Sequence, residues 1–383
     1  MFNRNIIVGI LGGGQLGKMT LDVANKWGLK VNILDLDINC PSSKLCNNFI
    51  QGDLMDYNSV MNFGKDVDII TIEIENVNVE ALKDLEKKGK IIFPQPSIIE
   101  IIQDKSLQKK FYLYNEIPTS SFHVFPNISE LKSFIISNKI SFPFIWKSSK
   151  MGYDGYGVKK ISNLKEVNQL TDCHCIVEEL VDIKKELAVM VVTNKSGEII
   201  NYPAVEMEFN QNSNQVEYIL SPANISEKLS IEAENLAVEL AKKLKIVGLL
   251  AVEMFLNSEG KILVNEVAPR PHNSYHFSIE GSYTSQFEQL LRSILDIPLG
   301  STKITQNSVM VNLVGEDGYF GPVNYNNFEQ IIGIEGVNPH IYGKFETRPN
   351  RKMGHVTVIN RDINKAKKIA KKIKETVTIN SKK

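Results

Sequence analysis

The chain has 383 residues, of which 43% are hydrophobic and 23% charged, as in an ordinary globular protein of two or three domains. Its 44 basic residues balance its 44 acidic ones, so there is no overall positive field for nucleic acid or an anionic membrane. No apolar run approaches the roughly 20 residues that cross a bilayer, and four cysteines are too few for a disulfide framework. We therefore expect a cytoplasmic protein with no nucleic-acid or membrane partner.

Strands and helices alternate over the first hundred residues. Continuous apolar runs are typical of buried parallel strands, whereas apolar residues at helical spacing indicate the helices between them. This alternation predicts an α/β domain with a doubly wound parallel sheet. The expected strands are 6–11, 31–34 and 68–74, and the expected helices are 16–27 and 79–88.

A glycine-rich turn follows the first expected strand and precedes the first expected helix. Gly12, Gly14 and Gly17 have the spacing at which backbone amides approach a phosphate at a helix N-terminus. Asp35 lies near the position of a ribose-binding carboxylate, so a dinucleotide-dependent oxidoreductase is one interpretation, and a tight turn without a ligand is another. We favour a third, in which the loop helps to hold a different polar ligand and Gln15 contacts it.

A second glycine-rich loop, residues 152–157, lies between two expected strands. It is not a P-loop, which opens a helix, but amides of such a loop can cover a triphosphate. Lys147 at the end of the preceding strand would add a charge for the phosphates. A hairpin turn without a ligand is the alternative.

Two carboxylates interrupt strongly apolar strands farther along the chain. Glu253 lies in LLAVEMFL and Glu266 in ILVNEVAP, and the short turn between these segments predicts antiparallel neighbours. Buried unpaired carboxylates are costly, so two that converge require a cation. With the Asn265 oxygen, the set suits magnesium. Outward-facing glutamates on an exposed face are the alternative.

Two polar segments complete the pattern. The loop APRPHNSYH directly follows the Glu266 strand, and its arginine, histidines and asparagine suit an anionic or heteroaromatic substrate. Near the C-terminus, KFETRPNRKMGH places four cations within nine residues, which is typical of a phosphate receptor. A solvated basic loop is the other interpretation of the second segment.

Taken in order, these segments resemble the ATP-grasp superfamily and, within it, the 5-(carboxyamino)imidazole ribonucleotide synthases of purine biosynthesis. The resemblance rests on GILGGGQLGKM, MGYDGYGV, NEVAPRPHNSYH and RPNRKMGH and spans almost the whole chain. It implies an α/β fold, α+β overall, with a doubly wound N-terminal domain (1–104), an ATP-grasp domain (105–297) and a small C-terminal domain (298–383). Within the second domain it implies a mobile flap subdomain at about 112–180, and it also implies a homodimer.

The resemblance implies an ATP- and Mg²⁺-dependent ligase that carboxylates aminoimidazole ribonucleotide with bicarbonate. The magnesium carboxylates would be Glu253 and Glu266, and the catalytic residues Asp154, Arg270 and His272. The substrate-binding set would be Gln15, Tyr153, Arg270, His272, Asn273, Lys344, Arg351 and Lys352. The ATP-binding set would be Lys105, Lys147, Gly152, Tyr153, Asp154, Gly155, Tyr156, Gly157, Val158, Glu178, Glu179, Leu180, Val181, Glu186, Asn265 and Glu266.

The chain departs from the family pattern at one place. Many members have a histidine near the end of the strand that here reads AVEMEFNQ, where this chain has Phe209 and Asn210. Three other functions stay open from the residues alone. These are a dinucleotide oxidoreductase, a nucleotide-binding regulator without catalysis, and an ATP-grasp purine enzyme that uses formate or glycine.

Overall fold

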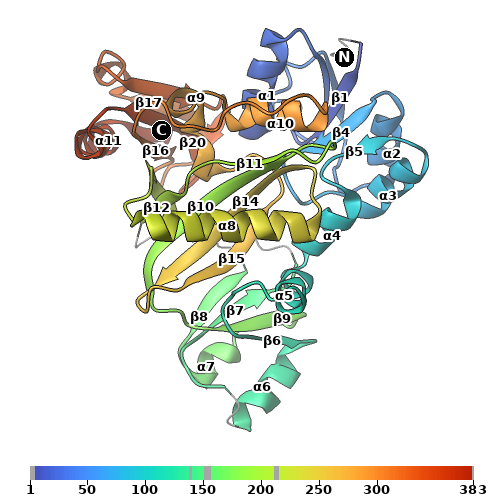
Figure 1. The fold of residues 1–383 in the computed structure, drawn as a ribbon, viewed down its shortest axis with the longest axis vertical. Helices are drawn as coiled ribbons and strands as arrows, with labels where there is room; N and C mark the ends of the chain where they lie inside the picture. The colour runs from blue at the N-terminus through green and yellow to red at the C-terminus, as the bar shows by residue number, and fades with distance from the viewer. Residues whose placement is uncertain (1–4, 138–139, 151–156, 211–214, 382–383) are drawn as a thin grey trace.

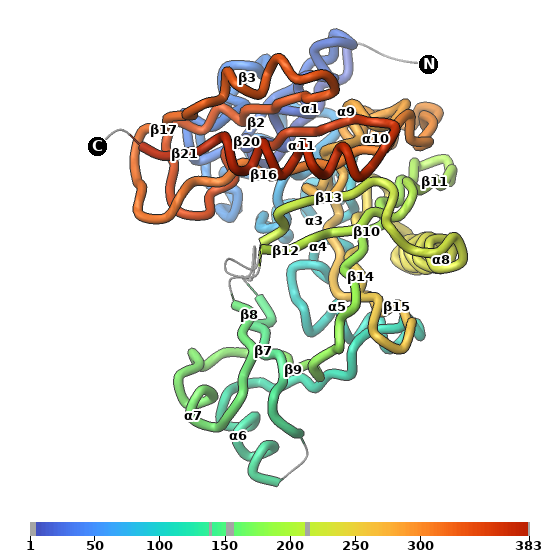
Figure 2. The backbone as a smooth tube through the Cα atoms, turned by 90° about the vertical axis from the view of Figure 1, so that its left-hand side faces the viewer, coloured from blue at the N-terminus to red at the C-terminus, as the bar shows by residue number. Residues whose placement is uncertain are grey.

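The computed structural model describes residues 5–137, 140–150, 157–210 and 215–381. Figure 1 shows the N-terminal α/β domain at the upper right, the C-terminal strands at the upper left, and a separate lobe below a central sheet. The tube in Figure 2, turned by 90°, shows the same lower lobe standing away from the rest.

The N-terminal domain contains a five-stranded parallel sheet of order β3-β2-β1-β4-β5, so the predicted doubly wound α/β domain is confirmed. Sequence analysis missed β3 and α2. Strand β3 is a short, half-exposed edge strand without a buried apolar run, so it gave no signal. The strands are β1 (Ile7–Leu11), β2 (Lys30–Asp35), β3 (Asn48–Gln51), β4 (Ile69–Ile72) and β5 (Ile91–Ile92). The helices are α1 (Gln15–Lys26), α2 (Tyr57–Lys65), α3 (Val79–Lys87) and α4 (Pro96–Gln103).

The lower lobe is a four-stranded sheet of order β6-β9-β7-β8 that α5 (Lys105–Tyr114) connects to the N-terminal domain. Strands β7 and β8 are antiparallel, and Lys147 pairs with Val158, so the predicted strand–loop–strand arrangement is confirmed. The lobe consists of β6 (Phe122–Phe125), α6 (Ile128–Ile136), β7 (Phe144–Ser148), β8 (Val158–Ile161), α7 (Leu164–Val167) and β9 (Cys175–Glu179).

The central sheet has helices on both faces. Helix α8 (Glu227–Leu244) crosses one face (Figure 1), and α10 (Gln286–Ile294) packs on the other and against α1. Because side chains alternate along a strand, Leu187, Val189 and Val191 belong to the α8 core, and Ala188, Met190 and Val192 to the α10 core. The strands are β10 (Ile183–Thr193), β11 (Ile199–Asn201), β12 (Val205–Phe209), β13 (Val216–Ser221), β14 (Gly248–Asn257) and β15 (Ile262–Ala268).

The central sheet continues into the C-terminal part of the chain, in the order β15-β14-β10-β12-β13-β16-β20-β18. Strand β16 (Ser308–Val314) pairs with β13, so hydrogen bonds cross the boundary predicted at residue 298, which stays a prediction. Helix α11 (Ile363–Thr376) packs on β16 and β20. The remaining elements are α9 (Ser278–Gly281), β17 (Gly321–Asn326), β18 (Val337–Ile341), β19 (Glu346–Thr347), β20 (Lys352–Ile359) and β21 (Thr378–Ser381).

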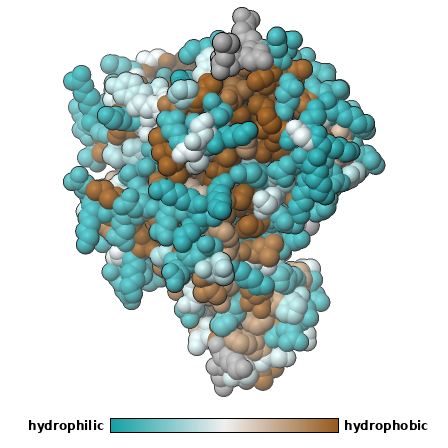
Figure 3. All heavy atoms as spheres, turned by 45° about the vertical axis from the view of Figure 1, so that its right-hand side comes forward, coloured by the Kyte–Doolittle hydropathy of each residue, from teal (hydrophilic) through white to brown (hydrophobic). Residues whose placement is uncertain are grey.

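The surface is mixed in character. On the face drawn in Figure 3, apolar atoms gather mainly in the upper half, and polar atoms surround them. Within the described ranges, no helix combines the length and the apolar character that a membrane span requires.

A test of this packing uses the small residues of α8. Ala233, Ala237 and Ala241 are buried against the sheet, within the core beneath α8. We expect Ala237→Leu to lower the free energy of unfolding by about 1–3 kcal/mol through overpacking. Asn235→Leu, on the exposed face of the same helix, is the matched control and should change it by less than about 0.5 kcal/mol. Equal unfolding free energies for the two variants in urea titrations would contradict this packing.

Candidate active site

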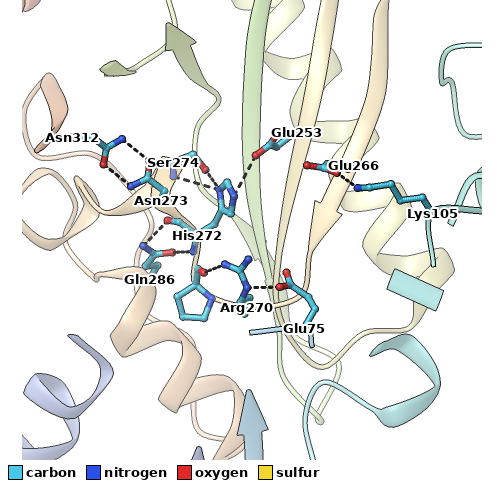
Figure 4. A network of polar contacts seen from close by, with 11 residues as sticks. Glu75, Lys105, Glu253, Glu266, Arg270, His272, Asn273, Ser274, Gln286 and Asn312 are labelled. Carbon is cyan, nitrogen blue, oxygen red and sulfur yellow. Dashed lines mark hydrogen bonds and ion pairs between the residues drawn. The ribbon is translucent and has the colours of Figure 1, made fainter. Parts of the chain in front are cut away.

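Strands β14 and β15 place two carboxylates directly opposite each other. Glu253 pairs with Glu266 in the antiparallel register, as the sequence predicted. Because Ala188 of β10 pairs with Glu253 and belongs to the α10 core, both carboxylates lie on the α10 face of the sheet. They therefore lie beyond the edge of the apolar core, on the side from which the loop after β15 approaches (Figure 4).

A β-bulge adds a third oxygen to this pair. The register shifts so that Met254 pairs with Val264, which leaves Asn265 as the extra residue. Bulges re-aim side chains beside active sites, and here the Asn265 Oδ1 accepts a hydrogen bond of 3.1 Å from the Lys147 Nζ. Adjacent side chains of a strand normally point to opposite faces. Because of the bulge, Asn265 and Glu266 both contact lysines on the same side of the sheet.

The two carboxylates differ in their electrostatic surroundings. The Lys105 Nζ lies 2.5 Å from the Glu266 Oε2 and holds the pKa of that carboxyl well below its usual range. Burial, and then the charge of Glu266, raises the pKa of Glu253. On the other side of Glu253, the His272 Nε2 lies 3.2 Å from the Glu253 Oε1. One carboxylate is thus neutralised by a lysine, while the other is left for a further cation.

The donor set fits magnesium. Carboxylate and amide oxygens are its preferred protein ligands, and it commonly uses one or two carboxylates with substrate phosphates. No three histidine, cysteine or acidic side chains converge as a metal site in the described part of the chain. Glu253 and Glu266 would therefore share the ion with water and with oxygens of a bound phosphate.

Glu178 is at the centre of a buried charge cluster. Its side chain is 3% exposed, and its oxygens lie 2.9 Å from the Lys147 Nζ and 3.3 Å from the Lys109 Nζ. Ser120 Oγ donates a further hydrogen bond of 2.7 Å. Burial opposes ionisation of Glu178, but Lys147 and Lys109 outweigh it and lower the pKa. Glu178 therefore orients Lys147, and both carboxylate oxygens of Glu178 are bound by side chains of the protein.

Further described residues of the predicted ATP-binding set lie at the start of β8, at the end of β9 and on β10. Glu179 and Leu180 are exposed at the end of β9, and Val181 follows them half-buried. Glu186 lies on β10, where burial raises the pKa of its carboxyl to about 7. Of the second glycine-rich loop, Gly157 and Val158 are described, and Gly157 has the positive φ of 74° that favours glycine. The predictions for Gly152, Tyr153, Asp154, Gly155 and Tyr156 lie outside the described residues.

The loop after β15 brings Arg270, His272 and Asn273 to the other side of the carboxylates (Figure 4). The Arg270 Nε lies 2.9 Å from the Glu75 Oε2, so an ion pair joins this loop to the N-terminal domain. The Asn273 side chain exchanges two hydrogen bonds of 2.9 Å with the Asn312 amide. Asn273 is thus bound within the protein, Arg270 is paired with Glu75, and His272 lies beside Glu253.

The basic C-terminal loop lies between the N-terminal domain and this site. The Lys344 Nζ donates to the Lys352 carbonyl oxygen at 2.7 Å, and the Arg351 Nη1 donates to the Glu346 carbonyl oxygen at 2.6 Å. Lys352 is close enough to Glu253 to lower the pKa of that carboxyl, against the net upward shift. Lys344 and Arg351 are thus bonded within the basic loop, and Gln15 begins α1.

The first glycine-rich loop is occupied by the chain itself. The Asp35 Oδ2 accepts a hydrogen bond of 2.7 Å from the Gly13 amide. Glu73, which follows β4, accepts from the Gly14 amide at 2.5 Å and the Leu16 amide at 3.0 Å. The amides that would bind a dinucleotide pyrophosphate are thus already bonded to carboxylates, which disfavours the oxidoreductase interpretation.

Sequence analysis missed four residues that shape the site: Glu73, Glu75, Lys109 and Gln286. Two acids directly after a buried strand, in TIEIEN, were the available signal for Glu73 and Glu75. Lys109 on α5 is 2% exposed and gives no periodic signal, although burial lowers its pKa to about 8. Gln286 is buried at the start of α10 and could be found only from its contacts.

The position where many members of the resembled family have histidine is at the end of β12. The Asn210 Nδ2 donates a hydrogen bond of 3.0 Å to the Glu217 Oε1. Asn210, Asn312 and Lys374 line a cavity of about 300 Å³ beside β16 and α11. The side chain at this position is therefore turned toward the C-terminal domain.

Three family models match the chain in order: a ribonucleotide synthetase preATP-grasp domain at residues 6–103, an ATP-grasp domain at 110–287, and a phosphoribosylaminoimidazole carboxylase C-terminal domain at 308–369. The chain is 34% identical to an N5-carboxyaminoimidazole ribonucleotide synthase of Aquifex aeolicus, over 98% of this chain and 97% of that protein. It also matches phosphoribosylaminoimidazole carboxylases of Saccharomyces cerevisiae and Vigna aconitifolia at 36% identity, and it spans only 63% and 64% of their lengths.

Solved structures agree with these matches. The N5-carboxyaminoimidazole ribonucleotide synthetase of Thermotoga maritima has a TM-score of 0.89 at 40% identity, covering 98% of this chain and all of that one. A synthase of Aspergillus clavatus in complex with ADP and 5-aminoimidazole ribonucleotide has a TM-score of 0.89 at 30% identity, covering 97% and 98% of the two chains. The matches extend over all three parts of the fold. The chain belongs to the N5-carboxyaminoimidazole ribonucleotide synthase family of ATP-grasp proteins.

Proposed function

We propose that the chain carboxylates 5-aminoimidazole ribonucleotide with bicarbonate, using ATP and magnesium, and releases N5-carboxyaminoimidazole ribonucleotide, ADP and phosphate. This proposal rests on the carboxylate pair Glu253 and Glu266. Lysines lie on one side of the pair, and Arg270 and His272 lie on the other. This arrangement supplies a triphosphate region and a separate substrate region that meet at one metal-binding position. Family membership supports the assignment of the substrates.

The first chemical step transfers the γ-phosphoryl group. An oxygen of bicarbonate attacks the γ-phosphorus, the bond to the leaving ADP oxygen breaks, and carboxyphosphate forms. Magnesium, when held by Glu253 and Glu266, supplies charge neutralisation at the phosphate oxygens. Lys147, held by Glu178, and Lys105, paired with Glu266, add fixed positive charge beside the same position.

The second step forms the carbon–nitrogen bond. The amino nitrogen of the ribonucleotide bonds to the carboxyl carbon of carboxyphosphate or of the CO₂ that it releases, and phosphate leaves. Arg270 and His272 orient the imidazole, and Asp154 accepts the proton lost from the amine. The basic residues Lys344, Arg351 and Lys352 hold the 5′-phosphate, because the lysines near Glu178 already serve the triphosphate.

The family resemblance supports a homodimer, and the composition of the chain supports a cytoplasmic location. Size-exclusion chromatography with light scattering should give twice the monomer mass, and cell fractionation should place the protein with cytoplasmic markers.

The substrate assignment predicts a specific dependence of ADP release. Purified protein should release ADP only with magnesium, and fastest with bicarbonate plus aminoimidazole ribonucleotide, because only this pair fills both regions of the site. A coupled assay across a panel of acids and amines measures this. Equal turnover with formate and glycinamide ribonucleotide would contradict the assignment and favour the related purine enzymes.

The metal assignment predicts that Glu266→Gln abolishes turnover while the fold survives. The amide keeps the shape but removes the charge opposite magnesium and Lys105, so kcat should fall by roughly 100-fold or more. Glu259→Gln, in the exposed turn between the same two strands, is the matched control and should retain activity. Near-normal turnover of Glu266→Gln at saturating magnesium would place the ion elsewhere.

The phosphate assignment predicts that Arg351→Ala or Lys352→Ala raises KM for the ribonucleotide and leaves KM for ATP unchanged. A charge-assisted phosphate contact contributes about 1.5–3 kcal/mol, which corresponds to a loss of roughly tenfold or more in affinity. Lys368→Ala, on the exposed face of α11, is the control for general loss of positive charge. Normal ribonucleotide binding by both variants in calorimetry would show that the basic loop is ordinary surface.

A further inference from the structure

Gln286 begins helix α10 and is fully buried, although it is polar. Its side chain is bonded to both backbone groups of a single residue in the loop after β15. The Gln286 Oε1 accepts a hydrogen bond of 2.8 Å from the His272 amide, and the Gln286 Nε2 donates one of 2.9 Å to the His272 carbonyl oxygen (Figure 4). A buried side-chain amide is costly unless its hydrogen bonds are made. These two bonds therefore stabilise Gln286 in its buried position.

A third contact fixes which way the amide points. The Gln286 Nε2 also lies 2.9 Å from the Nδ1 of His276, a fully buried ring whose pKa is lowered by burial. A neutral ring can accept this N–H at Nδ1. A flipped amide would place its oxygen against both the His272 carbonyl oxygen and this nitrogen. The side chain therefore has a single orientation that satisfies all its partners.

The bonds from Gln286 determine where the His272 imidazole lies. With both backbone groups of His272 held, the ring position depends only on side-chain rotation. That rotation is fixed because the His272 Nδ1 lies 2.8 Å from the Ser274 Oγ and accepts from the Ser274 amide at 3.4 Å. The Nε2 is thereby directed at Glu253, 3.2 Å away.

Helix α10 is a rigid base for this contact. Phe287, Leu290, Leu291 and Ile294 are buried, and the helix packs against β10, β14 and α1. The backbone N–H of Gln286 also donates to the Ser278 Oγ at 3.0 Å. The helix is therefore bonded at a second point to the segment that follows the loop. Strand β14, which carries Glu253, and the loop that carries His272 are thus both held against the same helix, α10.

From this geometry we propose that Gln286 is a positioning residue for catalysis: it holds the His272 backbone so that the imidazole orients the ribonucleotide next to Glu253. The inference rests on the proposed function, in which His272 touches that substrate. Its loss should misplace the acceptor amine without disturbing the lysines near the triphosphate. Carboxyphosphate would then form but be hydrolysed before it is captured.

The helix itself offers a matched control. Gln289, one turn farther along α10, is also fully buried and makes the same kind of two-bond contact, to the amide of Gly300 at 3.0 Å and to its carbonyl oxygen at 2.6 Å. Gly300 lies outside the site described above. Gln286→Met and Gln289→Met therefore remove equivalent hydrogen bonds from the same helix while keeping similar side-chain volume.

Steady-state kinetics on the full-length protein separates positioning from stability. For Gln286→Met we expect kcat/KM for aminoimidazole ribonucleotide to fall by about 10- to 100-fold, as for a small misplacement of an orienting group. KM for ATP should stay unchanged, and the ratio of ADP released to ribonucleotide carboxylated should rise well above that of the wild type. Gln289→Met should show a comparable loss of stability with the wild-type ratio.

A second measurement does not depend on turnover. The ring signals of the six histidines can be followed by NMR, with His272→Gln to assign the one at the site. Gln286→Met should shift the His272 signals, and Gln289→Met should leave them in place. Unshifted signals, or equal kinetic defects in the two methionine variants, would overturn the inference. Wild-type protein that fails to carboxylate the ribonucleotide would instead overturn the proposed function, and the NMR comparison would still decide whether Gln286 positions His272.

Discussion

The structure depends on the pairing of two acidic residues across adjacent strands. Glu253 and Glu266 face each other in the β14–β15 ladder, where like charges side by side are unfavourable. Each is stabilised differently: Lys105 neutralises Glu266, whereas Glu253 has a raised pKa and the His272 ring as its neighbour. The pair thus makes a position where a divalent cation and phosphate oxygens would lower the electrostatic energy of the protein.

Three contacts join the parts of the fold to one another. The Arg270–Glu75 ion pair joins the loop after β15 to the N-terminal domain. The Lys18 Nζ on α1 donates to the Ile341 carbonyl oxygen at 2.7 Å, and the His340 Nε2 lies 2.6 Å from the Glu280 Oε1. These contacts hold the basic C-terminal loop next to the first glycine-rich loop, so a substrate in this region would contact residues far apart in the chain.

The first glycine-rich loop shows how a common motif serves a different purpose. Its amides bond to Asp35 and Glu73 in the chain itself, and a carboxylate at a helix N-terminus is favoured for the same reasons as a phosphate. An ideal Cβ on Gly14 would lie 2.5 Å from the Glu73 Oε1, so a larger residue here would displace the Glu73 carboxylate. The motif therefore stabilises the N-terminal domain and does not by itself indicate a dinucleotide.

The sequence alone determined the elements with strong local patterns. Buried apolar runs identified β1, β4 and β14, and two acids interrupting apolar strands joined by a short turn predicted the pairing of Glu253 with Glu266. The order of the motifs indicated the family. The roles proposed for Arg351 and Lys352 rest on those motifs.

Only the tertiary structure decided the features that depend on contacts between distant segments. The bulge at Asn265, the burial of Lys109 against Glu178, and the two bonds from Gln286 to His272 have no periodic signature, because each depends on how separate strands and helices pack. The continuation of the central sheet from β13 into β16 was equally inaccessible, since strand neighbours are chosen by packing across nearly 90 intervening residues. Local chemistry selects strands and motifs, but long-range packing selects their partners, and the site is built from those partners.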